Sequence, residues 1–103
     1  MKFEKVSPTH MKPHPGIILA AELARRELSQ AALARIIGVS AMRISLVVAG
    51  LRPITADRAL RLRPLGRPAS YWLYRQCQFD LDRTRASLKL GRPKRIPPRR
   101  RRY

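Results

Sequence analysis

Apolar residues in the middle of the chain recur every three or four positions, which is the spacing of one face of an α-helix. The first such run begins at Pro15, a residue tolerated in the first turn of a helix, and places Ile18, Leu19 and Leu23 on one stripe. No stretch alternates between apolar and polar residues as a half-buried strand does. The pattern therefore predicts an all-α fold.

Residues that favour helix ends divide the chain into about five helices. Serine and threonine are preferred just before a helix, where the hydroxyl accepts a hydrogen bond from a free backbone N–H. Glycine is preferred just after a helix, and proline disfavours helical geometry in the residue before it. The predicted caps are Ser29, Ser40 and Thr55, and the predicted stops are Gly38, Gly50 and Pro64.

The last predicted helix, from about Ala69 to Ser87, carries two sets of apolar residues at helical spacing. The sets are Leu73, Cys77 and Leu81, four positions apart, and Trp72 and Phe79, seven apart. We expect both sets to face the core. Cys77 is then a small core residue, and Tyr71, Trp72 and Tyr74 are core and dimer-surface aromatics rather than platforms for nucleic-acid bases.

Two short helices joined by a tight turn form the sharpest pattern in the sequence. Ala34 is small where such helices must touch, and Gly38 supplies the turn. The residues that fill the space between the helices are Leu33, Ile37, Val39, Ile44 and Val47. This arrangement is typical of a helix-turn-helix, although similar packing also occurs in helical hairpins that bind no DNA.

The second helix of this motif is apolar on both faces. At 100° per residue, the residues that point into the core are Ala41, Ile44, Val47 and Val48. The opposite face carries Met42, Arg43, Ser45, Leu46 and Ala49. In a helix-turn-helix the outer face enters the major groove, where Arg43 can grip guanine or phosphate and Leu46 can pack on thymine methyl groups. We expect this helix to dock on DNA with few base-specific contacts.

Positive charge dominates the composition and gathers at the C-terminal end. The chain has 23 Lys and Arg against 6 Asp and Glu, a net charge of +17. Such a charge attracts phosphate backbones or anionic membranes and does not choose between them. Residues 88–103 combine this charge with prolines, so we expect a disordered basic tail, either a phosphate-seeking arm or a merely solvated segment.

The remaining composition narrows the class of protein. Residues 1–14, with two prolines and no apolar periodicity, are expected to form an N-terminal arm, which leaves residues 15–87 as the helix-turn-helix domain. A single cysteine forms no disulfide within the chain, and no apolar run is long enough to span a bilayer. The start of the chain lacks the apolar core of a signal peptide, so we expect a soluble cytoplasmic protein without a membrane partner.

No residue pattern suggests a cofactor, a metal ion or an enzyme. His10 and His14 have no metal-ligand spacing with Cys or acidic residues, and we expect both to be exposed. Asp80 and Asp82 are two positions apart and therefore point in different directions on a helix. Because no nucleophile, base and orienting group occur together, catalysis is not expected.

Short motifs over about residues 12–85 resemble the HigA-type antitoxins, also called virulence-associated protein I, of the Cro/C1 (XRE) helix-turn-helix group. The matching runs are His14-Pro15-Gly16, Leu28-Ser29-Gln30, Gly38-Val39-Ser40, Gly50, Arg52-Pro53-Ile54-Thr55 and Trp72-Leu73. The resemblance implies a five-helix, lambda repressor-like domain. It also implies a homodimer that binds a palindromic operator in its own promoter, at the bacterial nucleoid, and that neutralises a RelE-like or HigB-like mRNA-cleaving toxin.

The resemblance also assigns DNA contacts by position. The implied DNA-binding residues are Gln30, Ser40, Met42, Arg43, Ser45, Leu46 and Arg52. The chain departs from the usual family pattern at Ile17, Leu46, Ala49 and Pro64. These departures leave two other functions open: a toxin-binding protein with little sequence-specific DNA binding, and a solitary basic repressor or non-specific nucleic-acid binder.

Overall fold

The computed structural model describes residues 12–89 and 93–99 and shows no strand in these ranges. Its elements are α1 (Pro15–Arg25), α2 (Gln30–Ile37), α3 (Ala41–Val48), α4 (Ala56–Arg61), the 3-10 turn η1 (Arg63–Leu65) and α5 (Ala69–Leu88). The prediction of an all-α fold with about five helices is confirmed. Residues 1–11 of the expected arm, and residues 90–92 and 100–103 of the expected tail, lie outside the described residues.

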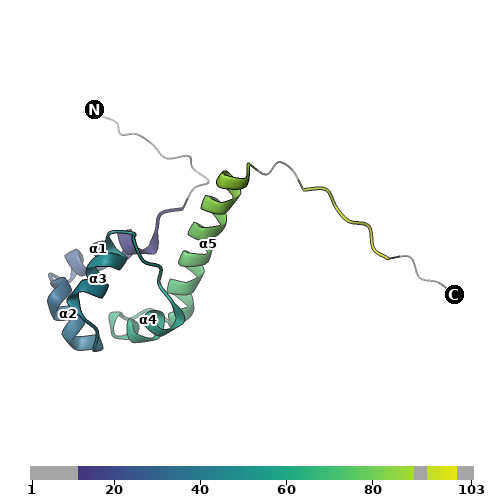
Figure 1. Ribbon diagram of the computed structural model, residues 1–103. Helices are drawn as coiled ribbons and strands as arrows, with labels where there is room; N and C mark the ends of the chain where they lie inside the picture. The colour runs from purple at the N-terminus through teal and green to yellow at the C-terminus, as the bar shows by residue number, and fades with distance from the viewer. Residues whose placement is uncertain (1–11, 90–92, 100–103) are drawn as a thin grey trace.

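The helices α1, α2 and α3 lie together, α4 follows at their edge, and α5 extends beyond them (Figure 1). With 20 residues, α5 is about 30 Å long. Trp72 in its first turn has no exposed surface, whereas every residue of α5 from Arg83 onward is exposed. The first half of α5 therefore closes the core and the second half projects from it.

One hydrophobic core joins all five helices. Its members are Leu19, Leu23, Leu33, Ala34, Ile37, Ile44, Val47, Ile54, Ala59, Leu62, Leu65 and Trp72. Half-buried residues that pack against it include Ile18, Val39, Val48 and Tyr71. Burial of this apolar surface is the main stabilising contribution for so small a domain.

The predicted helix boundaries are confirmed at the three hydroxyl caps. The Ser29 Oγ accepts from the backbone N–H of Ala32 at 3.0 Å, and the Ser40 Oγ accepts from that of Arg43 at 3.2 Å. Thr55 caps α4 in the same way. Gly38 and Gly50 both adopt positive φ, at 75° and 80°. Glycine adopts this left-handed backbone without a Cβ clash, so each of the two helices ends where the sequence predicted.

The prediction that Leu73, Cys77 and Leu81 face the core is wrong. Leu73 is 37% exposed, Leu81 is 53% exposed, and Cys77 is exposed. The rotation of α5 is set instead by Trp72 and by the buried Gln76, whose Oε1 accepts from the N–H of Ile54 at 2.8 Å. This buried amide satisfies a backbone group that would otherwise lose its hydrogen bond to water.

His14 is buried, so the expectation that it is exposed is also wrong. Its Nδ1 accepts from the N–H of Gly16 at 2.8 Å, which makes it the N-cap of α1. Its ring lies edge-on to that of Phe79 in α5, with centroids 4.9 Å apart. Burial lowers the pKa of His14, although the charge of Asp80 acts in the opposite direction. His10 lies outside the described residues.

Candidate nucleic-acid interface

The turn between α2 and α3 is closed by hydrogen bonds to one carbonyl group. The N–H groups of Gly38 and Val39 both bond to the carbonyl of Ala34, at 2.9 and 3.0 Å. Ala34 is only 4% exposed, so a larger side chain there would push the two helices apart. On either side of the turn, the structure buries four other residues of the predicted motif core: Leu33, Ile37, Ile44 and Val47.

Close contact with α1 fixes α3 from behind. A Cβ atom added to Gly16 would lie 2.0 Å from the carbonyl oxygen of Val47, near the end of α3. Only glycine permits this approach. His14 thus caps α1, Pro15 begins it, and Gly16 allows it to pack closely against α3. The inner side of α3 is held by this backbone contact as well as by buried side chains.

The opposite side of α3 is open to solvent. Ser40, Arg43 and Ser45 are exposed, and Met42 is 65% exposed. Leu46 is half-buried. The prediction that Ala41 points into the core is wrong, because Ala41 is the first residue of α3 and is exposed. With the exposed Ala49, the outer face is therefore a mixed surface with one cation, two hydroxyl groups and three apolar side chains.

Gln30 and Arg52 extend this surface onto neighbouring elements. Gln30 is the first residue of α2 and is half-buried, and Arg52 is exposed in the loop that follows α3. Backbone N–H groups at a helix start favour anions such as phosphate. All seven predicted DNA-contact residues therefore lie in α2, in α3 or in the segments next to α3. The helices α2 and α3 pack directly against each other.

Several arginine residues of α2, α3, α4 and the adjoining segments have no ionic partner in the part of the chain that the structure describes. Among residues 12–89 and 93–99, the ion pairs engage Arg25, Arg26, Arg61, Arg83 and Arg85. Those with no ion pair in these ranges include Arg35 of α2, Arg43 of α3, Arg52, Arg58 of α4 and Arg63 of η1. Sequence reasoning missed Arg35, Arg58 and Arg63, because a count of charges does not show which cations the acids neutralise.

The comparisons place the chain among antitoxins. No protein-family model matches it. It is 49% identical over 70 residues to Virulence-associated protein I of Dichelobacter nodosus, a match that covers 66% of this chain and 65% of that protein. The match thus spans slightly less than two thirds of this relative's length.

Solved structures match over more of their length. Pseudomonas aeruginosa antitoxin HigA with its higBA promoter is 38% identical, with a TM-score of 0.72 over 75% of this chain and 86% of that one. An addiction-module antidote protein of the HigA family from Coxiella burnetii is 32% identical, with a TM-score of 0.72 over 82% and 99%. The chain belongs to the HigA family of antitoxins.

The positions at which this HigA-family chain departs from the usual pattern leave its fold intact. Ile17 points outward from α1 and is 59% exposed. Ala49 is the C-cap of α3, and its N–H bonds to the carbonyl of Ser45 at 2.9 Å. Pro64 lies in η1, after α4 has ended at Arg61. The departures therefore alter side chains at the surface and not the packing of the motif.

Two further findings concern metal binding and membrane-spanning helices. Within the described ranges, no group of three or more His, Cys, Asp and Glu residues is placed to hold a metal ion. None of the helices described for this HigA-family chain has both the length and the apolarity needed to cross a membrane.

Proposed function

We propose that this HigA-family protein is a DNA-binding antitoxin that represses its own operon and neutralises a RelE-like, mRNA-cleaving toxin. The observation that carries the DNA-binding part is the open outer face of α3, on which Arg43, like Arg52 in the loop that follows, is exposed and has no ion pair among the described residues. Free guanidinium groups bind phosphates and guanine edges, whereas paired ones are already engaged. The proposed activity is binding and involves no catalysis.

The exposed residues divide into two roles. Arg43 reads a guanine edge, Ser40 and Ser45 make short polar contacts, and Met42 and Leu46 pack on thymine methyl groups. Gln30 and Arg52 hold the DNA backbone and carry no sequence information themselves. The Pseudomonas aeruginosa relative, whose structure includes its promoter, supports DNA binding by a protein of this fold.

A homodimer on a palindromic operator is the second part of the proposal. Leu73, Tyr74 and Leu81 form an exposed stripe on α5, and Tyr74 is 62% exposed. A second copy of the chain would cover this stripe and place two α3 helices on successive major grooves. Leu81→Arg should therefore give a monomer in sedimentation equilibrium, and a variant that remains dimeric would rule out this interface.

The basic tail, residues 88–103, adds affinity without sequence preference in this proposal. The helix α5 extends to Leu88, and residues 93–99 are exposed and carry no helix or strand. Contacts with phosphates release counterions and make binding depend steeply on salt. Binding its own promoter would place the protein at the nucleoid in the bacterial cytoplasm.

Duplex binding tests the DNA-binding part. Full-length protein is titrated with a duplex from its own promoter and with a scrambled duplex, each at low and near-physiological salt. Arg43→Ala should weaken promoter binding more than scrambled binding, and Arg52→Ala should weaken both equally. Arg85→Ala, an exposed change in α5 at an arginine already paired with Asp82, is the charge-matched control. Equal binding of the two duplexes by the unaltered protein would indicate a non-specific binder.

Co-expression tests the antitoxin part. The protein is produced with the RelE-like toxin proposed as its partner, and cell growth and co-purification are measured. We expect growth to be restored and the two chains to purify together. A stable toxin complex without promoter preference would favour the toxin-binding function alone.

A further inference from the structure

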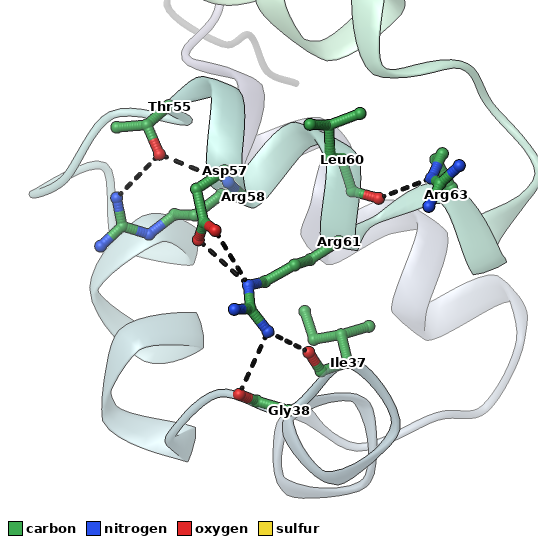
Figure 2. Close-up of polar contacts among 8 residues, drawn as sticks. All are labelled: Ile37, Gly38, Thr55, Asp57, Arg58, Leu60, Arg61 and Arg63. Atoms are coloured by element: carbon green, nitrogen blue, oxygen red, sulfur yellow. Dashed lines mark hydrogen bonds and ion pairs between the residues drawn. The ribbon is translucent and has the colours of Figure 1, made fainter.

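Arg61 of α4 joins three backbone or side-chain groups across the helix-turn-helix (Figure 2). Its Nε donates to both carboxylate oxygens of Asp57, at 3.2 and 3.1 Å. Its Nη1 donates to the carbonyl of Ile37 at 3.0 Å and to that of Gly38 at 3.4 Å. One guanidinium group therefore links the start of α4 to the end of α2.

The two carbonyls lie where α2 ends and the turn begins. Carbonyl groups in the last turn of a helix lack partners within the helix, and a cation near them is favoured by the helix dipole. Gly38 already donates its N–H to Ala34 on the inner side of the turn. Arg61 thus holds the same turn from the side of α4, two residues before Ser40 begins α3.

Asp57 directs the guanidinium group toward the turn. It occupies the Nε of Arg61 and leaves Nη1 free for the carbonyls. Both side chains are partly exposed, 43% for Arg61 and 61% for Asp57, so neither is needed to fill the core. Without Asp57, the guanidinium group would be free to turn toward a phosphate instead.

We propose that Arg61, held by Asp57, is a positioning residue that fixes the angle at which α3 meets DNA. The proposal rests on the proposed DNA-binding function but differs from it, because Arg61 acts through the turn and does not itself read bases. A phosphate contact by Arg61 would add affinity to any sequence, whereas a fixed turn adds discrimination between sequences.

Arg63 provides a matched control. It carries the same charge two residues away and is exposed, but its Nε donates only to the carbonyl of Leu60 in the turn just before it. Loss of Arg63 removes one positive charge without releasing the turn between α2 and α3. Arg61→Gln and Arg63→Gln are therefore the central pair, with Arg61→Lys and Asp57→Asn as further variants.

The first readout needs no DNA. Hydrogen exchange at the amides of Gly38 and Val39 is measured in the full-length variants. We expect exchange about threefold to tenfold faster in Arg61→Gln and Asp57→Asn, the range for losing one or two hydrogen bonds, and no change in Arg63→Gln. Equal exchange in Arg61→Gln and Arg63→Gln would overturn the proposal.

The second readout is the ratio of promoter to scrambled binding. Arg61→Gln and Arg61→Lys should both lower this ratio about threefold to tenfold. In Arg61→Lys the salt dependence of binding should stay unchanged, because lysine keeps the positive charge. Asp57→Asn should raise scrambled binding while lowering the ratio. If hydrogen exchange becomes faster in Arg61→Gln while the ratio of promoter to scrambled binding stays constant, the proposed role of Arg61 in DNA recognition would be overturned. If the unaltered protein shows no promoter preference, the proposed function fails, and exchange still decides whether Arg61 holds the turn.

Discussion

The helices α3 and α5 each carry apolar residues on two faces, yet their rotations are fixed in different ways. In α3 the inner residues Ile44 and Val47 are 5% and 2% exposed, and the outer Met42 is 65% exposed. In α5 the apolar stripe with Leu73 and Leu81 lies outside. Surrounding backbone holds α3, whereas one aromatic residue and one buried amide orient α5.

The contrast shows which structural features depend on residues that are close together in the sequence. For α3, the cap at Ser40 and the turn at Gly38 lie within a few residues of the helix, and their residue types indicate their roles. For α5, the deciding bond joins Gln76 to the N–H of Ile54, 22 residues earlier. No spacing within α5 reveals that partner, and apolar periodicity alone placed both apolar sets in the core, although only the set with the buried Trp72 and the half-buried Phe79 faces it.

The largest expected effect separates the two sides of α5. Trp72→Ala removes a fully buried side chain and should lower the free energy of unfolding by about 3–5 kcal/mol. Leu81→Ala should change it by about 0.5 kcal/mol or less in dilute, monomeric protein. Urea denaturation measures both. A similar loss in the two variants would mean that the stripe belongs to the core after all.

The backbone contact behind α3 should give the next largest effect. Gly16→Ala places a Cβ against the carbonyl of Val47 and should destabilise the fold by about 1–3 kcal/mol. Ile17→Ala, at the adjacent exposed position, is the control and should be nearly neutral. Thermal unfolding distinguishes them, and a neutral Gly16→Ala would show that α1 and α3 do not meet this closely.

Acid should loosen the contact between α1 and α5 through His14. Its pKa in the folded protein is lowered from the ordinary 6.5, mainly by burial. The neutral ring is therefore favoured by folding, and its contribution to stability is present above pH 6.5 and lost as pH falls through that value toward the folded pKa. His14→Asn keeps a cap but does not ionise, so its stability should depend less on pH between 7 and 5. Parallel pH profiles for the two proteins would contradict this assignment.

The smallest expected effect concerns the cap of α3. Ser40→Ala removes the bond to the N–H of Arg43 and should cost about 1 kcal/mol. Ser45→Ala, an exposed change in the middle of the same helix, should cost almost nothing. Chemical denaturation of the two variants provides the comparison. Equal stability would mean that α3 is held by tertiary packing alone.

The sequence predicted much of the fold because its strongest signals act within a few residues. Ser29, Ser40 and Thr55 cap helices where expected, and the motif core packs as expected. Burial of His14 was missed because the ring is covered by Phe79, far along the chain. The bonds from Arg61 to the end of α2 were missed for the same reason, since the carbonyls that accept them lie 24 and 23 residues earlier.

The central claim is that the outer face of α3, and not the basic tail, gives the protein its sequence preference. The most direct test compares full-length protein with a variant in which Arg99, Arg100, Arg101 and Arg102 are changed to Gln. Each is titrated with promoter and scrambled duplexes at near-physiological salt. We expect both affinities to fall together and their ratio to persist. A ratio that falls to one would contradict the claim and assign the preference to the tail.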